Sequence, residues 1–314
     1  MNYLGILAAL LPYFGYILLG AVTNRLGISK GKPERYLNFT LINVMYPILS
    51  FNFIIGNPVM ENLTRIASAP FVGFFSIVAG FGAAYLASAF IKGMRKESRG
   101  SFSFTVGMYN YLFFAVPLTT ALYGEDVVGV LLVHNLGNDI AVWSVGAGMI
   151  AGGGLYNPFR LLKNPPIVAI FLALIINHYT GGAPMPAFLK AFTSTVAFIA
   201  IPAGLFISGA TLADNMKMFN KSDGLKLMGA GVAIRLFLVP VIVVGIVALL
   251  PLPKEVKMVT AIQASMPSGV STAVIIRYFK GDAHTAVPVI LSTTIIAIFT
   301  MPLWIRIFQA ILGV

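Results

Sequence analysis

The chain has 314 residues, of which 58% are hydrophobic and only 10% are charged. Soluble domains carry about 25% charged residues, so this composition excludes an ordinary soluble protein and indicates one that crosses the membrane several times. The net charge of +11 does not indicate nucleic-acid binding, because basic residues of membrane proteins gather in cytoplasmic loops. The absence of cysteine excludes disulfides, thiolate metal sites and thiol nucleophiles.

Ten apolar segments follow one another along the chain, most of them near the length that a helix needs to cross a bilayer. The predicted spans are approximately residues 3–22, 35–55, 70–91, 102–122, 127–151, 165–179, 188–212, 225–250, 256–279 and 284–312. The first segment lacks the basic start of a cleavable signal peptide and is expected to be retained. The sequence therefore predicts an all-α polytopic membrane protein.

Basic residues in the connecting loops predict the orientation. With the N-terminus outside, fifteen Lys and Arg residues fall on the inside and five on the outside. The inside set is Arg25, Lys30, Lys32, Arg35, Lys92, Arg95, Lys96, Arg99, Arg160, Lys163, Lys217, Lys221, Lys226, Arg277 and Lys280; the outside set is Arg65, Lys190, Lys254, Lys257 and Arg306. Basic loops stay in the cytoplasm, so both termini are predicted to be extracytoplasmic.

The fourth and ninth segments are interrupted by residues that a membrane helix does not favour. In the fourth, Asn110 stands mid-span in the stretch MYNYLFFAVP, which ends at Pro117. In the ninth, Pro267 removes a backbone donor, and the small hydroxyl residues Ser268 and Ser271 follow it. We interpret each segment as two half-helices that meet at mid-membrane, with Asn110 as a candidate N-cap of the second half.

The two interruptions fall at matching places in the two halves of the chain. A midpoint within 155–166 divides it into residues 1–154 and 155–314, each with five predicted spans. This predicts two inverted five-helix repeats, which bring the starts of two half-helices to one point near the midplane. Free N–H groups and helix dipoles there are suited to an anion, most simply a carboxylate. The alternative is that both prolines are ordinary kinks.

Two charged residues lie inside the predicted hydrocarbon region, Asp139 in the fifth segment and Arg235 in the eighth. Intramembrane ionisable groups are costly, so they face a partner or a cavity. In one interpretation the two residues pair and hold their helices together. In the other, Asp139 carries a proton or another cation, or Arg235 balances an anionic substrate.

Other polar residues accompany these charges. In the fifth segment Asn135 shares a helix face with Asp139, and Asn138 shares one with His134. We expect this polar surface to face the interrupted fourth segment, and His134 to be an ordinary hydrogen-bonded residue. The candidate substrate-binding residues are Asn110, Tyr109, Tyr111, Gln263, Pro267, Ser268, Ser271 and, on the opposite side of the path, Asn43.

Several motifs together resemble the auxin efflux carrier family, which includes the plant PIN carriers. They are the fourth segment with Asn110 followed by Pro117, the pair Asn164–Pro165 that opens the sixth segment, PAGLFISGATLA at 202–213, MPSG at 266–269 and RYFKGD at 277–282. The resemblance covers nearly the whole chain. It identifies a prokaryotic, PIN-like member of the wider superfamily of bile-acid, arsenite and riboflavin transporters, expected in the cytoplasmic membrane.

This resemblance implies a fold like that of bile-acid sodium symporters and NhaA, with broken fourth and ninth helices that cross. It also implies elevator-type alternating access and a homodimer. Substrates of the family are organic anions such as auxin, malonate and malate. The implied domains are a scaffold of about 1–56 and 165–213 and a transport domain of about 70–152 and 225–312.

By the same resemblance, Asn110 and the Pro267–Ser268 pair match the crossover where PIN-type carriers hold the substrate carboxylate. Two positions depart from the family pattern. Tyr109 stands where those carriers have proline, and Ser268 stands where they have glutamine. Both changes alter the pocket, so auxin itself is not assumed as the substrate.

The expected function is secondary active transport of a small organic anion, with no cofactor and with a proton or sodium as the candidate coupling ion. A sodium-coupled symporter of the bile-acid type is one alternative, although a single membrane carboxylate with Asn and Ser oxygens supplies few ligands. A receptor that does not transport is another. An intramembrane enzyme is not expected, because aspartyl chemistry needs two carboxylates and the chain has no HExxH motif.

Overall fold

The computed structural model describes residues 2–152, 163–216 and 221–314. The midpoint between the two predicted halves, with the basic residue Arg160, lies outside the described residues, as does Lys217. Within the described residues the secondary structure is helical, and seven helical runs are long and apolar enough to cross a membrane. The predicted all-α membrane protein is confirmed at this level.

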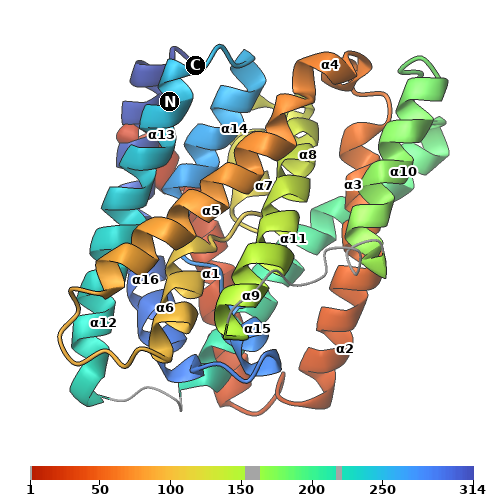
Figure 1. Cartoon of the computed structure of the whole chain (residues 1–314). Helices are drawn as coiled ribbons and strands as arrows, with labels where there is room; N and C mark the ends of the chain where they lie inside the picture. Colours follow the sequence, from red (N-terminus) through yellow and green to blue (C-terminus); the bar gives the residue numbers. More distant parts are fainter. Residues whose placement is uncertain (1, 153–162, 217–220) are drawn as a thin grey trace.

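Helix occurs in each of the ten predicted spans (Figure 1). Eight of them hold one helical run each. These are α1 (Tyr3–Arg25); α2 (Lys32–Thr40), η1 (Leu41–Met45) and α3 (Tyr46–Ile54); α5 (Ser68–Ser88); α8 (Glu125–Ala141), η3 (Val142–Gly146) and α9 (Ala147–Ile150); α10 (Pro165–Tyr179); α11 (Ala187–Asn215); α12 (Lys221–Ala233), η6 (Ile234–Leu238) and α13 (Val239–Leu249); and α16 (Ala286–Leu312).

The fourth and ninth spans are each divided into two helices. The fourth consists of α6 (Ser98–Gly107) and α7 (Ala115–Tyr123), and the ninth of α14 (Lys254–Ser265) and α15 (Thr272–Tyr278). The short helical turns η2 (Pro58–Glu61), α4 (Leu63–Ile66) and η7 (Ala283–Thr285) lie in connections. In the view of Figure 1, α6 and α15 lie toward the lower end of the molecule, and α7 and α14 toward the upper end.

Helix boundaries follow local chemistry. The side chain of Asn2 accepts a hydrogen bond of 2.8 Å from the N–H of Gly5 and so caps α1. Pro165 opens α10, where its missing N–H would have had no helical partner. At the C-terminus, Gly313 adopts the left-handed conformation (φ 66°) that ends α16.

Small residues let neighbouring helices approach closely. A Cβ atom on Gly137 of α8 would lie 1.7 Å from the carbonyl oxygen of Pro70 in α5. A Cβ atom on Gly20 of α1 would lie 1.9 Å from the carbonyl oxygen of Phe206 in α11. Because lipid gives apolar helices little reason to associate, such close backbone packing is a main source of helix–helix stability in membranes.

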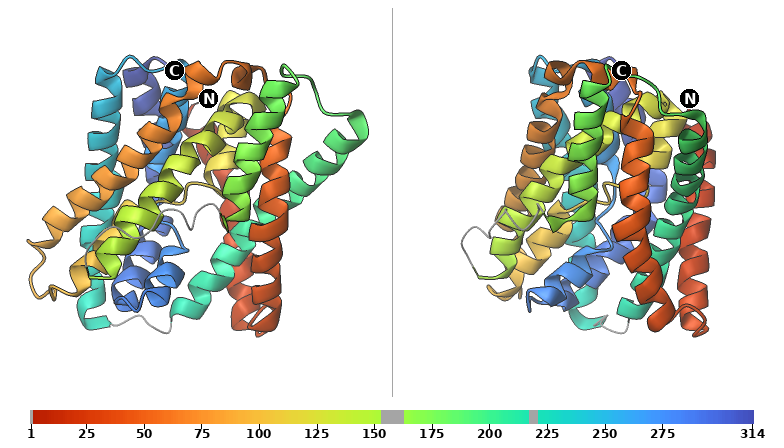
Figure 2. Two further views of the ribbon diagram at one scale, coloured as in Figure 1. Left: turned by 45° about the vertical axis from the view of Figure 1, so that its right-hand side comes forward. Right: turned by 90° about the vertical axis from the view of Figure 1, so that its right-hand side faces the viewer.

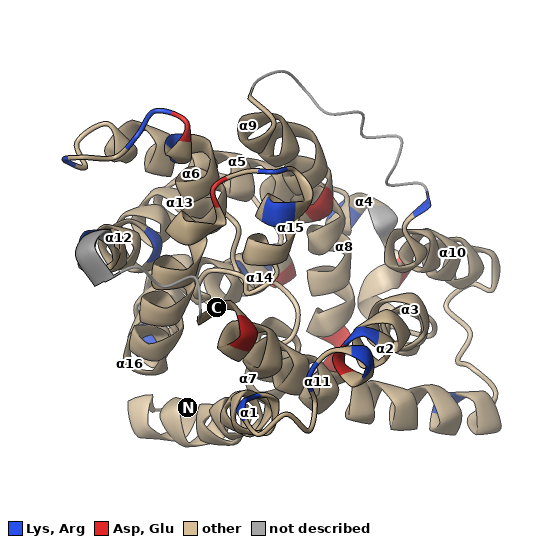
Figure 3. Cartoon of the chain, turned by 90° about the horizontal axis from the view of Figure 1, so that it is seen from below, with Lys and Arg blue, Asp and Glu red and all other residues tan. Residues whose placement is uncertain are grey.

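The two ends of the molecule differ in charge. Both termini lie at the upper end, together with α4 and the turn between α10 and α11 (Figures 1 and 2). Seen from below, the ribbon carries Lys and Arg positions on several connections and helix ends (Figure 3). The lower end includes the α1–α2 turn and the connection before α6, which belong to the predicted inside loops.

Candidate functional site

The interruptions of the fourth and ninth spans meet and hydrogen-bond to each other. The backbone N–H of Asn110 donates to the carbonyl of Pro267 at 2.9 Å, and the N–H of Gly269 donates to the carbonyl of Met108 at 2.8 Å. Between these two hydrogen bonds, Tyr109 and Ser268 form an isolated antiparallel β-bridge. The two unwound segments are 159 residues apart in the sequence at this bridge, and each supplies hydrogen-bond partners to the other's backbone in the interior of the protein.

Two details of the predicted fourth-segment break are corrected. Pro117 does not lie in the break but in the first turn of α7, which begins at Ala115. The unwound residues precede it. Asn110 is not the N-cap of α7 either, because Phe114 holds that position and no side chain caps the helix there.

A cavity of about 330 Å³ lies against the meeting point of the two interruptions. Its size is that of a small-molecule site. It is lined by Asn38, Leu41, Ile42, Tyr46, Met108, Tyr109, Asn110, Tyr111, Leu112, Phe113, Asp139, Trp143, Asn164, Pro166, Ile207, Ser208, Thr211, Gly269, Val270, Ser271, Val274 and Ile275. These residues come from α2, η1, α3, α10 and α11 on one side and from both interruptions, α8, η3 and α15 on the other.

Asn110 presents a free amide to this cavity. Its side chain is 8% exposed and has no hydrogen bond to any other described residue. The backbone N–H groups of further lining residues also lack acceptors among the described residues, including those of Leu112, Phe113, Val270 and Ser271. Asn110 and Val270 are buried, Leu112 and Phe113 are half-buried, and Ser271 is exposed. These unpaired donors around one cavity are available to hydrogen-bond a ligand with acceptor oxygens.

The predicted substrate-binding residues divide into two groups. Asn110, Tyr109, Tyr111 and Ser271 line the cavity, whereas Gln263, Pro267, Ser268 and Asn43 do not. The Nδ2 group of Asn43 donates to the carbonyl of Phe39 in its own helix at 2.8 Å, so its side chain is not directed at the cavity. The hydroxyl of Ser268 is buried behind the bridge with no partner among the described residues.

Amide side chains of α8 and α14 hold the fourth-segment interruption in place. Asn135 and Gln263 both donate to the carbonyl of Tyr111, at 2.9 and 3.2 Å, and Gln263 also donates to Oδ1 of Asn135 at 2.9 Å. The hydroxyl of Tyr109 donates to Oδ1 of Asn138 at 3.0 Å, and Asn138 donates to Asn135 at 2.9 Å. Gln263, Asn135 and Asn138 therefore position the unwound backbone and do not reach the cavity.

Asp139 and Arg235 do not pair. The hydroxyl of Tyr111 donates to Oδ1 of Asp139 at 2.6 Å. Among the described residues, salt bridges join Arg65 to Glu255 and Arg95 to Asp282, and none involves Asp139 or Arg235. The interpretation in which the two intramembrane charges form a structural pair is therefore wrong, because each has its own set of partners.

Arg235 is fully buried and binds the end of α14. Its guanidinium donates to the carbonyls of Met266, Ala264 and Gln263 at 2.9, 3.1 and 3.3 Å. The carbon Cζ lies 4.7 Å from the centre of the Tyr109 ring. A cation at a helix C-terminus meets the negative end of the dipole, so Arg235 stabilises the ninth-segment interruption. It contacts the ring of Tyr109 and does not line the cavity.

His134 differs from its predicted role. The ring is fully buried, and neither nitrogen has a hydrogen-bond partner among the described residues. It lies where α8 and α5 are in close backbone contact, since a Cβ atom on Gly73 would be 2.2 Å from the carbonyl oxygen of His134. The expectation of an ordinary hydrogen-bonded histidine is wrong for the described part of the chain.

Several lining residues were not predicted from the sequence. They are Asn38, Tyr46, Trp143, Asn164, Ser208 and Thr211, together with the apolar lining. Asn164 could have been predicted from the sequence, because it is part of the motif that opens the sixth span. The others are single polar or aromatic residues in helices, and only the packing of α2, α3 and α11 against the interruptions brings them to the cavity.

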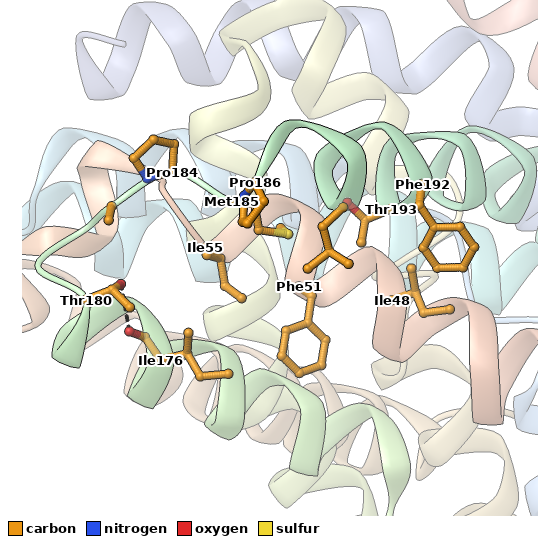
Figure 4. Close-up of a pocket in the computed structure, with 12 residues that line it drawn as sticks. Ile48, Phe51, Ile55, Ile176, Thr180, Pro184, Met185, Pro186, Phe192 and Thr193 are labelled. Atoms are coloured by element: carbon orange, nitrogen blue, oxygen red, sulfur yellow. Dashed lines mark hydrogen bonds between the residues drawn. The ribbon is translucent and has the colours of Figure 1, made fainter.

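A second cavity of about 350 Å³ lies among α3, α10 and α11 (Figure 4). Its lining is almost wholly apolar, with Phe51, Ile55 and Phe192 among the side chains that face it. The hydroxyl of Thr180, at its edge, is bound to the carbonyl of Ile176 at 2.8 Å. Such a lining is poorly suited to an anion, so this second cavity is not a candidate anion site.

Comparison with known proteins identifies the family. The family model described as "Membrane transport protein" matches residues 6–157 and 155–305, which is nearly the whole chain. The chain belongs to this family. It is the auxin efflux carrier family that the sequence motifs resemble, and its members are transporters and not enzymes.

Individual members of the family agree with this assignment. The chain is 23% identical over 312 residues to an "Uncharacterized transporter" of Methanothermobacter thermautotrophicus, covering 97% of this chain and 99% of that one. It is 21% identical over 293 residues to an uncharacterized transporter of Methanocaldococcus jannaschii, covering 92% and 94%. A protein of Rhizobium meliloti named "Putative malonate transporter" is 28% identical over 221 residues, covering 65% of each chain.

Proposed function

We propose that this protein is a secondary active transporter that carries a small organic anion and binds it in the cavity beside Asn110. The observation that carries the proposal is the set of unpaired donors around that cavity, namely the Asn110 amide and the free backbone N–H groups of the two interruptions. A carboxylate supplies several acceptor lone pairs at one point and so satisfies several of these donors at once.

A dicarboxylate of the malonate type is the first substrate to test. The rhizobial relative carries malonate in its name, and the cavity of about 330 Å³ has room for a small anion. One carboxylate would bind Asn110 and neighbouring N–H groups. The remainder of the anion would lie against the polar groups on the far wall, which include Asn38, Asn164 and Thr211.

The proposed architecture is two inverted five-helix repeats, residues 1–154 and 155–314. In this scheme a scaffold domain (about 1–56 and 165–213) holds still while a transport domain (about 70–152 and 225–312) moves as an elevator. The division is supported by packing, because α1 packs mainly on α11 and α3 on α10, whereas α5 packs on α8 and α12 on α16. The cavity lies between the two groups, where alternating access requires the substrate to be.

We propose that the lower, basic end faces the cytoplasm of a prokaryotic cell and that both termini are extracytoplasmic (Figure 3). The cavity is bounded by α15, α2 and the start of α10, which belong to this lower part (Figure 1). In this scheme the structure corresponds to an inward-facing state. We also propose a homodimer, in keeping with the family resemblance.

Sodium coupling is less well supported than a mechanism without it. Backbone carbonyl oxygens at an unwound helix end are natural ligands of a hard cation. Here the carbonyls at the end of α14 are occupied by the guanidinium of Arg235. Replacing sodium by choline is therefore expected to leave uptake unchanged.

Purified protein in liposomes tests the proposal. Radiolabelled malonate should accumulate in proteoliposomes against an imposed malonate gradient. Unlabelled malonate should raise the melting temperature of the purified protein, because a ligand of the folded state stabilises it. Thermal stabilisation without flux would favour the alternative of a receptor. A screen of mono- and dicarboxylates in which none raises the melting temperature would contradict the proposed substrate class.

A further inference from the structure

The cavity proposed for an anion contains one negative charge and no positive one. Among the described residues that line it, Asp139 is the only charged side chain. The carboxyl group is 7% exposed, and the hydroxyl of Tyr111 donates to its Oδ1 at 2.6 Å. No described Lys, Arg or His lies within salt-bridge distance of it.

The groups that surround Asp139 from other elements do not neutralise it. Tyr111 comes from the fourth-segment interruption, and Tyr46, whose hydroxyl has no partner among the described residues, comes from α3. The far wall contributes uncharged Asn, Ser and Thr side chains from α2, α11 and the start of α10. Arg235 of η6 contacts the Tyr109 ring and donates to the carbonyls at the end of α14.

On the same helix, the amide groups near Asp139 are bonded to other residues. Asn135 and Asn138 bind each other, Tyr109, Gln263 and the Tyr111 carbonyl, and neither forms a hydrogen bond with Asp139 among the described residues. His134 is buried toward α5 and does not line the cavity. An anion that enters therefore meets an unneutralised carboxylate in a low-dielectric space, and like charges in one site disfavour the ionised form of the group that can take a proton.

We propose that Asp139 takes up one proton when the anion binds, so that substrate and proton occupy the cavity together and are transported together. This inference rests on the proposed function. The proton comes from water at the mouth of the cavity and adds to Oδ2, while the Tyr111 O–H keeps its hydrogen bond to Oδ1. No other bond forms or breaks, and the proton leaves again when the anion is released.

The structural arrangement gives Tyr111 a role in linking the two events. Its hydroxyl binds Asp139, and its backbone follows directly on Asn110, the proposed ligand of the anion. A change in the Asp139 hydrogen bond is therefore transmitted through one residue to the anion site. Asp139 acts as the proton-binding residue, and Tyr111 as a positioning residue.

Calorimetric titration of the purified protein with disodium malonate tests this proposal. When binding is accompanied by proton uptake, the measured enthalpy depends on the ionisation heat of the buffer. We expect about one proton per bound malonate at neutral pH in the wild type, and close to none in Asp139→Asn. Glu125→Gln, the same kind of change at an exposed position on the same helix, should behave like the wild type.

The outcomes separate this proposal from the proposed function. Proton linkage would be overturned if malonate bound with an enthalpy independent of the buffer, or if proton uptake on binding persisted in Asp139→Asn. Either result would leave the anion site intact. Absence of any malonate heat would count against the proposed substrate, and a measurement without substrate then decides the proton proposal.

That measurement uses Trp143, which lines the cavity one helical turn after Asp139. In Trp304→Phe, Trp143 is the only tryptophan, since the chain has two. Its emission should show a pH transition that disappears when Asp139→Asn is added and persists when Glu125→Gln is added. A transition that survives Asp139→Asn, or no transition in the parent, would overturn the assignment of Asp139 as the proton site.

Discussion

At the scale of single residues, Asn110 is distinguished from the other intramembrane amides by what it lacks. Asn135, Asn138 and Gln263 are hydrogen-bonded to the unwound backbone and to each other, whereas the Asn110 side chain has no partner among the described residues. In the sequence, all four residues are equally polar amides within apolar spans. Only the positions of their partners in space distinguish the proposed substrate ligand, Asn110, from the amides that hold the unwound backbone in place.

Asn110→Ala should weaken malonate binding by about 10- to 100-fold, since a hydrogen bond to a charged group contributes about 1.5–3 kcal/mol. The melting temperature without ligand should change little, because the side chain has no internal bond to lose. Asn43→Ala is the matched control: it removes an amide that lies outside the cavity and binds its own helix. Equal affinity of both variants would remove Asn110 from the proposed site.

The sequence could indicate Asn110 and Asp139 because a polar or charged residue in the middle of an apolar span is costly and needs a reason. It could not indicate Tyr46 or Thr211, since such residues are common in membrane helices. It also misplaced Asn43, whose amide is satisfied by the Phe39 carbonyl one turn earlier. A backbone partner on the same helix is available to any Asn, and sequence spacing does not reveal when it is used.

At the scale of elements, Pro267 and Pro117 show how accurately a proline in the sequence locates a break between helices. Pro267 lies in the unwound segment between α14 and α15, as predicted. Pro117 lies in the first turn of α7, and the unwound residues precede it. A proline thus marks a helix boundary nearby, and whether it stands in the break or just after it depends on which backbone groups find partners across the break.

Arg235 connects η6 with the end of α14, and this contact should be essential to the ninth-segment interruption. Arg235→Met removes three charge-assisted hydrogen bonds and leaves buried carbonyls without a donor, so we expect a loss of about 3 kcal/mol or more of unfolding free energy. Arg306→Met, at an exposed position of α16, should change stability by less than about 0.5 kcal/mol. Thermal unfolding in detergent compares the two. Similar melting temperatures would contradict a structural role for Arg235.

The close contact of α5 with α8 leads to a second prediction for an element. Gly137→Ala places a methyl group 1.7 Å from the Pro70 carbonyl, so the helices must separate; overpacking of this kind costs about 1–3 kcal/mol. Gly15→Ala in α1 is the control, because nothing lies within 4 Å of the added Cβ atom and alanine favours a helix. Melting temperature and yield are the measurements. An unchanged Gly137→Ala protein would show that α5 and α8 adjust freely.

At the scale of the whole molecule, the sequence predicted helix in each of the ten spans, because hydrophobic length is a local property that a membrane strictly constrains, and its motifs predicted the family. It could not predict which helices pack together. The lining of the cavity illustrates this, because Asn38 and Asp139 belong to spans two and five and meet only through packing between the two helix groups. The inverted repeat and the elevator remain proposals about the relation between those groups.

The elevator mechanism can be tested with the thiol-free chain, in which any introduced cysteines are the only reactive ones. Phe14 of α1 and Phe114, just before α7, have ring centres 5.0 Å apart, and they belong to the proposed scaffold and transport domains respectively. A short thiol cross-linker in Phe14→Cys/Phe114→Cys should abolish malonate uptake by joining the two domains, and cleavage of the cross-link should restore it.

The control joins two residues within the proposed transport domain. Phe237 and Trp304 have ring centres 6.2 Å apart, so the same reagent should bridge Phe237→Cys/Trp304→Cys. If the transport domain moves as a rigid body, this cross-link leaves uptake unchanged, because no distance within the body needs to change during transport. Arrest by both cross-links would indicate motion inside the transport domain. Continued uptake with the Phe14–Phe114 cross-link in place would exclude an elevator that moves α7 past α1.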